Sequence, residues 1–346
     1  MRIHTCIVPI FAAVGIVLGA GCGNHGQTAS TSTTGVNTKS GKMLNIFMLP
    51  KKKGLAYFTS CSEGAAEAAK DLGDVNFVYD GPSDGSPDEA ASLLETWNLK
   101  GADAICVSVN DPSVLSPPMK AAEKQGTHIL TFDADGDKDS REFFVDQATS
   151  EQIGDALVDG MAKDIGGPDP AGKVAIITAT LTAANQNEWI DFMKKRLAKY
   201  PKLQLVAIKP CNEDQALAFQ VTQDLLKTYP DLKGIFGISS VSFPGAAEAV
   251  KQAGMSGKVL VTGLSTPNDM KKYVADGTVK SVILWNTKDL GYLTVYAAEA
   301  VATGKLKPGA TTFHAGRLGN KVVDGDKILL GNILVFNKDN INKYNF

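Results

Sequence analysis

The chain has 346 residues, of which 35 are basic and 37 acidic, so its formal charge is −2 at pH 7. This near balance, without any basic stripe, gives no support for nucleic-acid binding. Hydrophobic residues make up 44% of the sequence, which is typical of a globular protein and excludes a wholly disordered chain.

The first 22 residues predict export. Arg2 precedes an apolar run at 7–18, which is too short to span a bilayer comfortably, and small residues at 19–21 lead to Cys22. The segment resembles a bacterial lipoprotein signal, which implies cleavage before Cys22 and lipid attachment to its thiol. It departs from that pattern at Gly19, where a large aliphatic residue is usual. The alternative is an N-terminal membrane anchor that is retained.

Residues 23–42 are mostly Asn, Gln, Thr, Ser and Gly. Such a segment cannot bury enough apolar surface to offset its conformational entropy, so it predicts a flexible tether. Beyond it, Cys61, Cys106 and Cys211 form an odd set without metal-ligand spacing. We therefore expect free thiols, no disulfide and no metal site.

The first part of the folded region alternates short apolar strands with amphipathic helices. Near-continuous apolar runs are typical of parallel strands covered on both faces, and they lie at 43–49, 76–79, 104–109 and 129–132. Ser86, Pro87 and Glu89 have the spacing of a helix start, with an N-cap serine and a proline in the first turn. A second helix is expected over 113–125, ended by Gly126.

A second series of the same kind begins near residue 171. Strands are expected at 174–178, 203–209, 234–238, 259–264 and 279–284, with helices starting near Asn187, Asp214, Pro244 and Pro267. A further helix at 290–303 and a last strand at 328–336 follow. Two consecutive sets of βαβ units predict an α/β fold with two doubly wound, Rossmann-like lobes.

The last helix (290–303) and the last strand (328–336) are best explained if the chain crosses back between the lobes. We expect an N-terminal lobe of residues 43–147 plus 287–325 and a C-terminal lobe of residues 148–286 plus 326–346, joined by hinge crossings. In open α/β sheets, ligands bind at the carboxyl ends of the strands. A cleft between the lobes is therefore the predicted binding site.

Polar and aromatic residues follow the predicted strands, where such a cleft needs them. Carboxylates, amides and a lysine can exchange hydrogen bonds with vicinal hydroxyls, and aromatic faces can stack on a sugar ring. These side chains suit a small, uncharged, polyhydroxylated ligand. The candidates are Lys51, Tyr57, Phe58, Asp133, Asp135, Asn185, Gln186, Trp189, Ser240, Trp285 and Asn286, with Ser239 beside them.

Structural roles compete with several of these assignments. The neighbouring lysines 52–53 are expected to form a solvated charge run. One of the aromatic residues 57–58 is expected to pack on the core. Asp135 could cap the next turn, and Trp189 could serve core packing in a helix. Asp133 follows an apolar strand, where a carboxylate needs partners, so a ligand role is favoured there.

From residue 44 to residue 346, the chain resembles type I periplasmic solute-binding proteins of bacterial ABC importers. Within them it is similar to the autoinducer-2-binding proteins of the Lsr transporter and their rhamnose-binding relatives. The most specific segments are Leu49-Pro50-Lys51, Tyr57-Phe58-Thr59-Ser60, Thr131-Phe132-Asp133-Ala134-Asp135, Asn185-Gln186-Asn187-Glu188-Trp189, Gly263-Leu264-Ser265-Thr266-Pro267-Asn268, Leu284-Trp285 and the stretch 336–344.

The resemblance implies site residues one by one. Autoinducer-binding members use a lysine, two aspartates, a glutamine and two backbone groups, and the chain keeps Lys51, Asp133 and Gln186. It departs at three positions, where Asn185 replaces the second aspartate, Ile238 a proline and Ser240 an alanine. A hydroxyl network tuned to two carboxylates would lose about 1–3 kcal/mol at a mismatched partner. The resemblance thus favours a monosaccharide such as rhamnose, with autoinducer-2 as the alternative.

Two other classes of protein fit the sequence poorly. An enzyme on a Rossmann-like fold would need a glycine-rich phosphate turn after the first strand, where only Gly54 is found, or a nucleophile motif that the chain lacks. A sugar-responsive repressor would need an N-terminal helix-turn-helix in place of the export signal. We expect a non-enzymatic monomer without a cofactor. It would lie in the periplasm or on the outer face of the membrane, with a membrane permease as partner.

Overall fold

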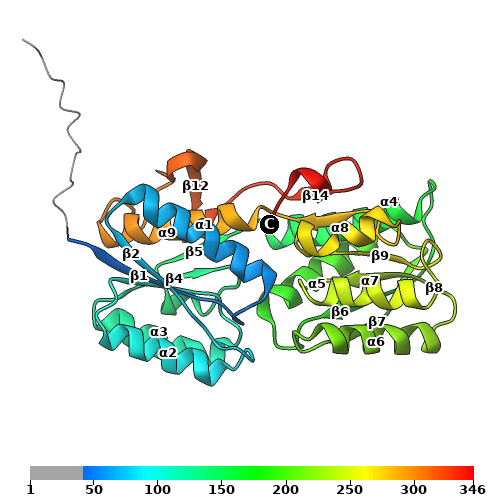
Figure 1. The fold of residues 1–346 in the computed structure, drawn as a ribbon, viewed down its shortest axis with the longest axis horizontal. Coiled ribbons are helices and arrows are strands. Elements are labelled where there is room, and N and C mark those ends of the chain that lie inside the picture. Colours follow the sequence, from blue (N-terminus) through cyan, green and yellow to red (C-terminus); the bar gives the residue numbers. More distant parts are fainter. Residues whose placement is uncertain (1–41) are drawn as a thin grey trace, which may run out of the picture. The chain divides into compact units, whose positions relative to one another are not determined.

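The structure, a computed structural model, describes residues 42–346, so the expected signal, tether and Cys22 lie outside the described residues. In the described part, an α/β fold contains two sheets whose central strands are parallel (Figure 1). The predicted fold class of two doubly wound lobes is confirmed. No helix in residues 42–346 is long and apolar enough to cross a bilayer.

The N-terminal lobe is built on an eight-stranded sheet. Its strands, in sheet order, are β11 (Thr312–His314), β12 (Asn320–Asp324), β13 (Lys327–Leu329), β5 (Phe143–Asp146), β4 (His128–Phe132), β3 (Ala104–Val107), β1 (Leu44–Leu49) and β2 (Val75–Tyr79). The six strands from β13 to β2 run parallel, and β12 and β11 add an antiparallel edge. This edge was not predicted, because its strands are short and half-exposed.

Two pairs of helices cover this sheet. Helices α1 (Ala56–Leu72) and α9 (Thr287–Ala302) lie on one face, and α2 (Pro87–Leu99) and α3 (Pro112–Lys124) lie on the other (Figure 1). Helices α1 and α9 approach closely at two glycines, since a Cβ on Gly64 or Gly291 would lie 1.8 Å from a backbone oxygen of the opposite helix. This contact holds the start of α9 against α1, next to the cleft.

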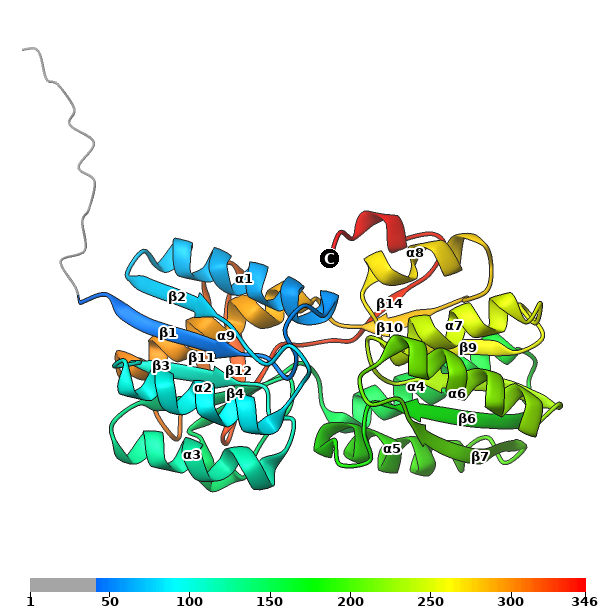
Figure 2. The ribbon, with the colours of Figure 1, turned by 60° about the horizontal axis from the view of Figure 1, so that its bottom comes forward.

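The C-terminal lobe has a smaller sheet in the order β7 (Leu203–Pro210), β6 (Gly172–Thr178), β8 (Leu232–Gly237) and β9 (Leu260–Gly263). A bridge from Leu264 to Ile283 joins it to β10 (Val282–Leu284), which pairs with β14 (Leu334–Phe336). Its helices are α4 (Ser150–Ile165), α5 (Ala184–Leu197), α6 (Gln215–Thr228), α7 (Ser242–Gln252) and α8 (Pro267–Ala275) (Figure 2). Helix α4 packs on α5, and α6 packs on α7.

The chain passes between the lobes three times, after β5, after β10 and after β13. The prediction of one last strand at 328–336 was wrong, because this segment forms two strands in different sheets. Strand β13 pairs with β5 in the N-terminal lobe, and β14 pairs with β10 in the C-terminal lobe. The third crossing therefore lies within residues 330–333, not at residue 325 as expected.

Local signals explain several element boundaries. The Ser86 hydroxyl accepts a hydrogen bond from the Glu89 amide at the start of α2, as its spacing predicted. Gly126, with φ of +94°, lies two residues after α3. Helix α4 was missed in the sequence, although Thr149 and Gln152 form a capping box at its start. The three cysteines of the described residues are free and buried.

Candidate functional site

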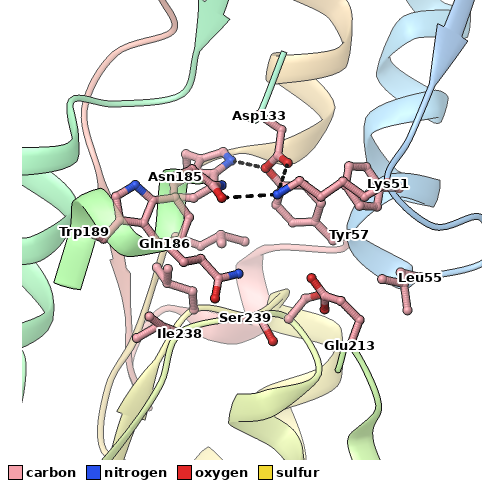
Figure 3. A pocket seen from close by; sticks show the side chains of 15 residues that line it. Lys51, Leu55, Tyr57, Asp133, Asn185, Gln186, Trp189, Glu213, Ile238 and Ser239 are labelled. Carbon is pink, nitrogen blue, oxygen red and sulfur yellow. Dashed lines mark hydrogen bonds and ion pairs between the residues drawn. The ribbon is translucent and has the colours of Figure 1, made fainter. Parts of the chain in front are cut away.

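A cavity lies at the carboxyl ends of the strands, where the two lobes face each other (Figure 3). The space between its lining residues is about 430 Å³, a volume that includes open solvent. Both lobes contribute to its wall. The lining residues are Lys51, Leu55, Tyr57, Phe58, Asp133, Asn185, Gln186, Trp189, Glu213, Ile238, Ser239, Ser240, Leu264, Leu284 and Trp285.

Asp133 forms the polar centre of the N-terminal wall. It follows β4 directly and has a positive φ of +62°, a conformation that aspartate tolerates better than most residues. Its Oδ1 accepts a hydrogen bond from the Tyr57 hydroxyl at 2.8 Å, and its Oδ2 accepts one from the Ser108 hydroxyl at 2.7 Å. The Gln147 side-chain amide donates to its backbone oxygen at 3.1 Å. The buried carboxylate is therefore fixed in place by its neighbours.

Lys51 connects the two walls. The residue is buried, and its Nζ lies 3.7 Å from Asp133 Oδ2 in the same lobe. The same ammonium donates to Asn185 Oδ1 of the C-terminal lobe at 3.3 Å, as Figure 3 shows. A buried ammonium needs such partners because its desolvation is costly. A ligand in the cavity would therefore meet a positive charge that is already oriented.

Aromatic side chains form the floor between the lobes. Trp285, at the second crossing, donates from Nε1 to the Tyr57 hydroxyl at 2.9 Å. Its ring meets those of Tyr57 and Trp189 edge-to-face, with centroids 6.1 Å and 6.3 Å apart. Burial and the nearby Asp133 raise the pKa of Tyr57 well above its usual value, so its hydroxyl stays protonated and keeps donating. Phe58 packs edge-to-face on Tyr57 and Phe132.

Amides from the start of α5 line the C-terminal wall. Gln186 Oε1 accepts from the Thr178 hydroxyl at 2.6 Å and from the Ala179 amide at 2.8 Å. Both bonds fix the carboxamide through its oxygen, so its Nε2 hydrogens are not used by these two donors and remain available to a ligand. Asn185 likewise uses its oxygen for Lys51, which leaves its Nδ2 hydrogens.

The end of β8 completes this wall. Ile238 is fully buried, and Ser239 exchanges hydrogen bonds with Ser242 in the first turn of α7. Ser240 is half-buried, and its backbone oxygen accepts from the Ser265 hydroxyl at 2.9 Å. All three departures from the autoinducer-binding pattern, Asn185, Ile238 and Ser240, therefore border the cavity.

Ten of the twelve predicted site residues border this cavity, and Asp135 and Asn286 do not. Asp135 binds the buried Arg141 through both carboxylate oxygens, at 3.0 Å and 2.7 Å. Asn286 caps helix α9 by accepting from the Asp289 amide. Both side chains have structural partners, so we leave them out of the proposed binding site.

The sequence prediction missed five lining residues. Three of them are apolar: Leu55 precedes α1, Leu264 follows β9, and Leu284 ends β10. Ser239 was noted at its strand end but not assigned to the site. Glu213 follows β7, so the rule applied to the other strands would have found it. Within residues 42–346, no group of His, Cys, Asp and Glu side chains could hold a metal ion.

Comparisons with known proteins agree with the fold described above. The model of a family described as a periplasmic binding protein domain matches residues 46–306. The fold is similar to that of LsrB from Clostridium saccharobutylicum in complex with AI-2, with a TM-score of 0.83 and 28% identity over 88% of this chain and 100% of that one.

Two further structures are similar. A solute-binding protein from Clostridium phytofermentas with bound L-rhamnose has a TM-score of 0.82 and 28% identity, over 87% of this chain and 98% of its own. A sugar ABC transporter protein from Actinomyces odontolyticus is 34% identical over 88% of this chain and 98% of its own, with a TM-score of 0.72.

Proposed function

We propose that this chain, which belongs to the periplasmic binding protein family, captures a small neutral sugar as the binding component of an ABC importer. Membership of a solute-binding family agrees with the expectation of a protein that is not an enzyme. The observation that carries the proposal is the cavity between the lobes, where aromatic rings meet oriented amides and a buried Lys51–Asp133 pair. Sugars present both apolar C–H faces and hydroxyl groups to such a site.

The proposed ligand is a monosaccharide such as L-rhamnose. Support comes from the similar protein that holds L-rhamnose and from the neutral amide at Asn185. The oxygen of this amide is engaged by Lys51, so the group offers hydrogens to the ligand, whereas a carboxylate could only accept. A sugar hydroxyl can accept from these hydrogens.

Autoinducer-2 is the second candidate. The observation in its favour is the similarity to LsrB in complex with AI-2, together with Lys51, Asp133 and Gln186 at the cavity. Against it stand Asn185, Ile238 and Ser240, which change the polarity and shape of the C-terminal wall. We rank it second for this reason.

In the proposed mechanism, the lobes rotate about the three crossings and close over the ligand. Closure excludes water, so each hydrogen bond to a ligand hydroxyl gains strength in the low-dielectric gap. Two hydrogen bonds already cross the mouth, from Lys51 to Asn185 and from Lys52 Nζ to the Glu213 backbone oxygen at 3.4 Å. Lys52, expected as a solvated charge, thus contacts the opposite lobe.

The closed protein would then deliver its ligand to a membrane permease as a monomer. We propose that it works in the periplasm or on the outer face of the membrane, held there through a lipid on Cys22. Palmitate labelling of the wild type and of Cys22→Ser tests the anchor. Label in both proteins would exclude Cys22 as the attachment site.

A thermal-shift screen tests the ligand. The probes are L-rhamnose and other deoxyhexoses, common hexoses and pentoses, and autoinducer-2. A ligand at about 100 times its dissociation constant should add about 2.7 kcal/mol to the free energy of unfolding, a readily visible shift. Stabilisation by a sugar alone supports our first choice, and stabilisation by autoinducer-2 alone supports the second. No stabilisation by any probe would contradict the proposed function.

A further inference from the structure

Glu213 is the one acidic side chain of the cavity without a hydrogen-bond partner in the described residues. It follows β7, in a turn where Asn212 and Glu213 both have φ of +51°. Its Oε2 is shielded from solvent and accepts no hydrogen bond. In Figure 3 the side chain points from the C-terminal lobe into the space below Lys51 and Tyr57.

The other carboxylate and carboxamide side chains of the cavity already accept hydrogen bonds from protein groups. Four lining residues carry a carboxylate or carboxamide oxygen: Asp133, Asn185, Gln186 and Glu213. Asp133 accepts from two hydroxyls, Asn185 Oδ1 accepts from Lys51, and Gln186 Oε1 accepts two bonds. Among these four residues, the two carboxamides therefore offer free hydrogens, and Glu213 is the one whose side-chain oxygens accept no hydrogen bond in the described residues.

The excess of free donors over free acceptors matters for a ligand that carries several hydroxyl groups. A hydroxyl donates one hydrogen bond as well as accepting. When it enters a closed cavity, a hydrogen without an acceptor costs free energy, and so does a carboxylate without a donor. A ligand hydroxyl placed against Glu213 would remove both costs at once.

We propose that Glu213 is a specificity-determining contact that accepts a hydrogen bond from a ligand hydroxyl on the edge facing residues 211–213. The proposal rests on the proposed function, since it names a contact within the same site. It implies a polyol with a free hydroxyl at that edge. An analogue with hydrogen or O-methyl at this position should be rejected.

The charged groups around Glu213 provide a second test of the contact, the dependence of ligand affinity on pH. Burial and the Asp133 charge raise the pKa of Glu213, and the Lys51 and Lys52 ammonium groups act in the opposite direction. The nearby Cys211 thiol has a pKa raised to about 11 and stays neutral, and the carboxylates of Asp84 and Asp111 line an adjacent cavity that Glu213 shares. A hydroxyl donor favours the ionised carboxylate, so ligand affinity should fall as the pH is lowered.

The test is calorimetric titration of the wild type, Glu213→Gln and Glu188→Gln with L-rhamnose, or with whichever sugar of the panel gives the largest thermal shift. Glu188 is the matched control, because it is exposed, belongs to the same lobe and does not line the cavity. We expect Glu213→Gln to weaken binding about 10- to 100-fold, the loss typical of a hydrogen bond to a charged group. Its melting temperature without ligand should not fall, and its affinity should depend less on pH than that of the wild type.

The outcomes separate the two proposals. Equal sugar affinity for the wild type and Glu213→Gln would overturn the role of Glu213 and leave the proposed function intact. Equal losses in Glu213→Gln and Glu188→Gln would also overturn it, because the effect would then be general charge removal. If no probe binds the wild type, the proposed function fails, and the Glu213 contact fails with it.

Discussion

The N-terminal wall of the cavity has its polar groups bound to one another, whereas the C-terminal wall leaves many of its groups free. On the first wall, Tyr57, Ser108 and Lys51 all converge on the Asp133 carboxylate. On the second wall, the carboxamides of Asn185 and Gln186 keep their hydrogens, and Oε2 of Glu213 has no hydrogen-bond partner within residues 42–346. The first wall is preorganised, and the second is completed by what enters the cavity.

This difference predicts two kinds of mutational effect. A change in the N-terminal wall should disturb a network that exists without ligand, and therefore both stability and binding. A change in the C-terminal wall should alter ligand affinity or preference with little effect on the empty protein. The predictions below test this division, beginning with the largest expected effect.

Asp133→Asn should weaken sugar binding by at least about 100-fold, because the variant loses the charge that holds Lys51 while keeping a side chain that tolerates positive φ. The hydrogen bonds from Tyr57 and Ser108 also predict a lower melting temperature. Titration calorimetry and a thermal melt measure the two effects. Asp139→Asn, at an exposed carboxylate, is the control. Unchanged affinity would remove Asp133 from the binding site.

Lys51→Met should weaken binding about 10- to 100-fold, because the ammonium that bridges Asp133 and Asn185 is lost. The matched control is Lys53→Met, since Lys53 forms an exposed ion pair with Asp80. Titration calorimetry compares the ligand affinities of Lys51→Met and Lys53→Met. Similar affinities for both variants would show that the bridge between the walls does not contribute to binding.

The fold could be predicted from the sequence because its signals are local. Near-continuous apolar runs marked strands such as β1 and β4, and Ser86 and Gly126 marked helix ends. Strand β13 could not be placed in this way. Residues 328–336 are apolar except at Gly331 and Asn332, and whether a three-residue strand on either side pairs with β5 or β10 depends on long-range contacts.

The candidate site was predictable for a related reason. The carboxyl ends of parallel strands converge, so residues after β4, β6 and β8 meet even though the sequence separates them widely. What the sequence does not reveal is which polar side chain already has a partner. Asp133 and Asp135 were both candidates in the sequence, yet Asp135 binds the buried Arg141, and Asp133 faces the cavity.

Asn185→Asp should change ligand preference more than stability, because Asn185 belongs to the C-terminal wall. A carboxylate there accepts but cannot donate, and it brings a second negative charge close to Lys51. We expect the ratio of autoinducer-2 affinity to L-rhamnose affinity to rise about 10-fold. Competition in the thermal-shift assay measures this ratio. A fall in melting temperature as large as that of Asp133→Asn would contradict the division between the walls.

The smallest effect on binding is expected at Asp146, which lies behind the N-terminal wall at the first crossing. Burial raises the pKa of this carboxyl to about 7, and Lys327 Nζ, at 3.9 Å, offsets only part of the desolvation. The folded state therefore keeps a proton on Asp146 at pH values where the unfolded chain has released it. Stability from this group is highest near pH 4 and is lost as the pH rises toward 7.

Asp146→Asn removes the titration and should flatten the decline of melting temperature with pH. Above pH 7 the variant should be more stable than the wild type, by up to about 4 kcal/mol at about 1.36 kcal/mol for each unit of pKa. Melts from pH 4 to pH 8 measure the effect, with Asp139→Asn as control. Because Asp146 does not line the cavity, sugar affinity should change less than about threefold. Destabilisation at pH 8 would instead indicate that Asp146 is ionised and paired with Lys327, and that the network of the N-terminal wall extends to the hinge.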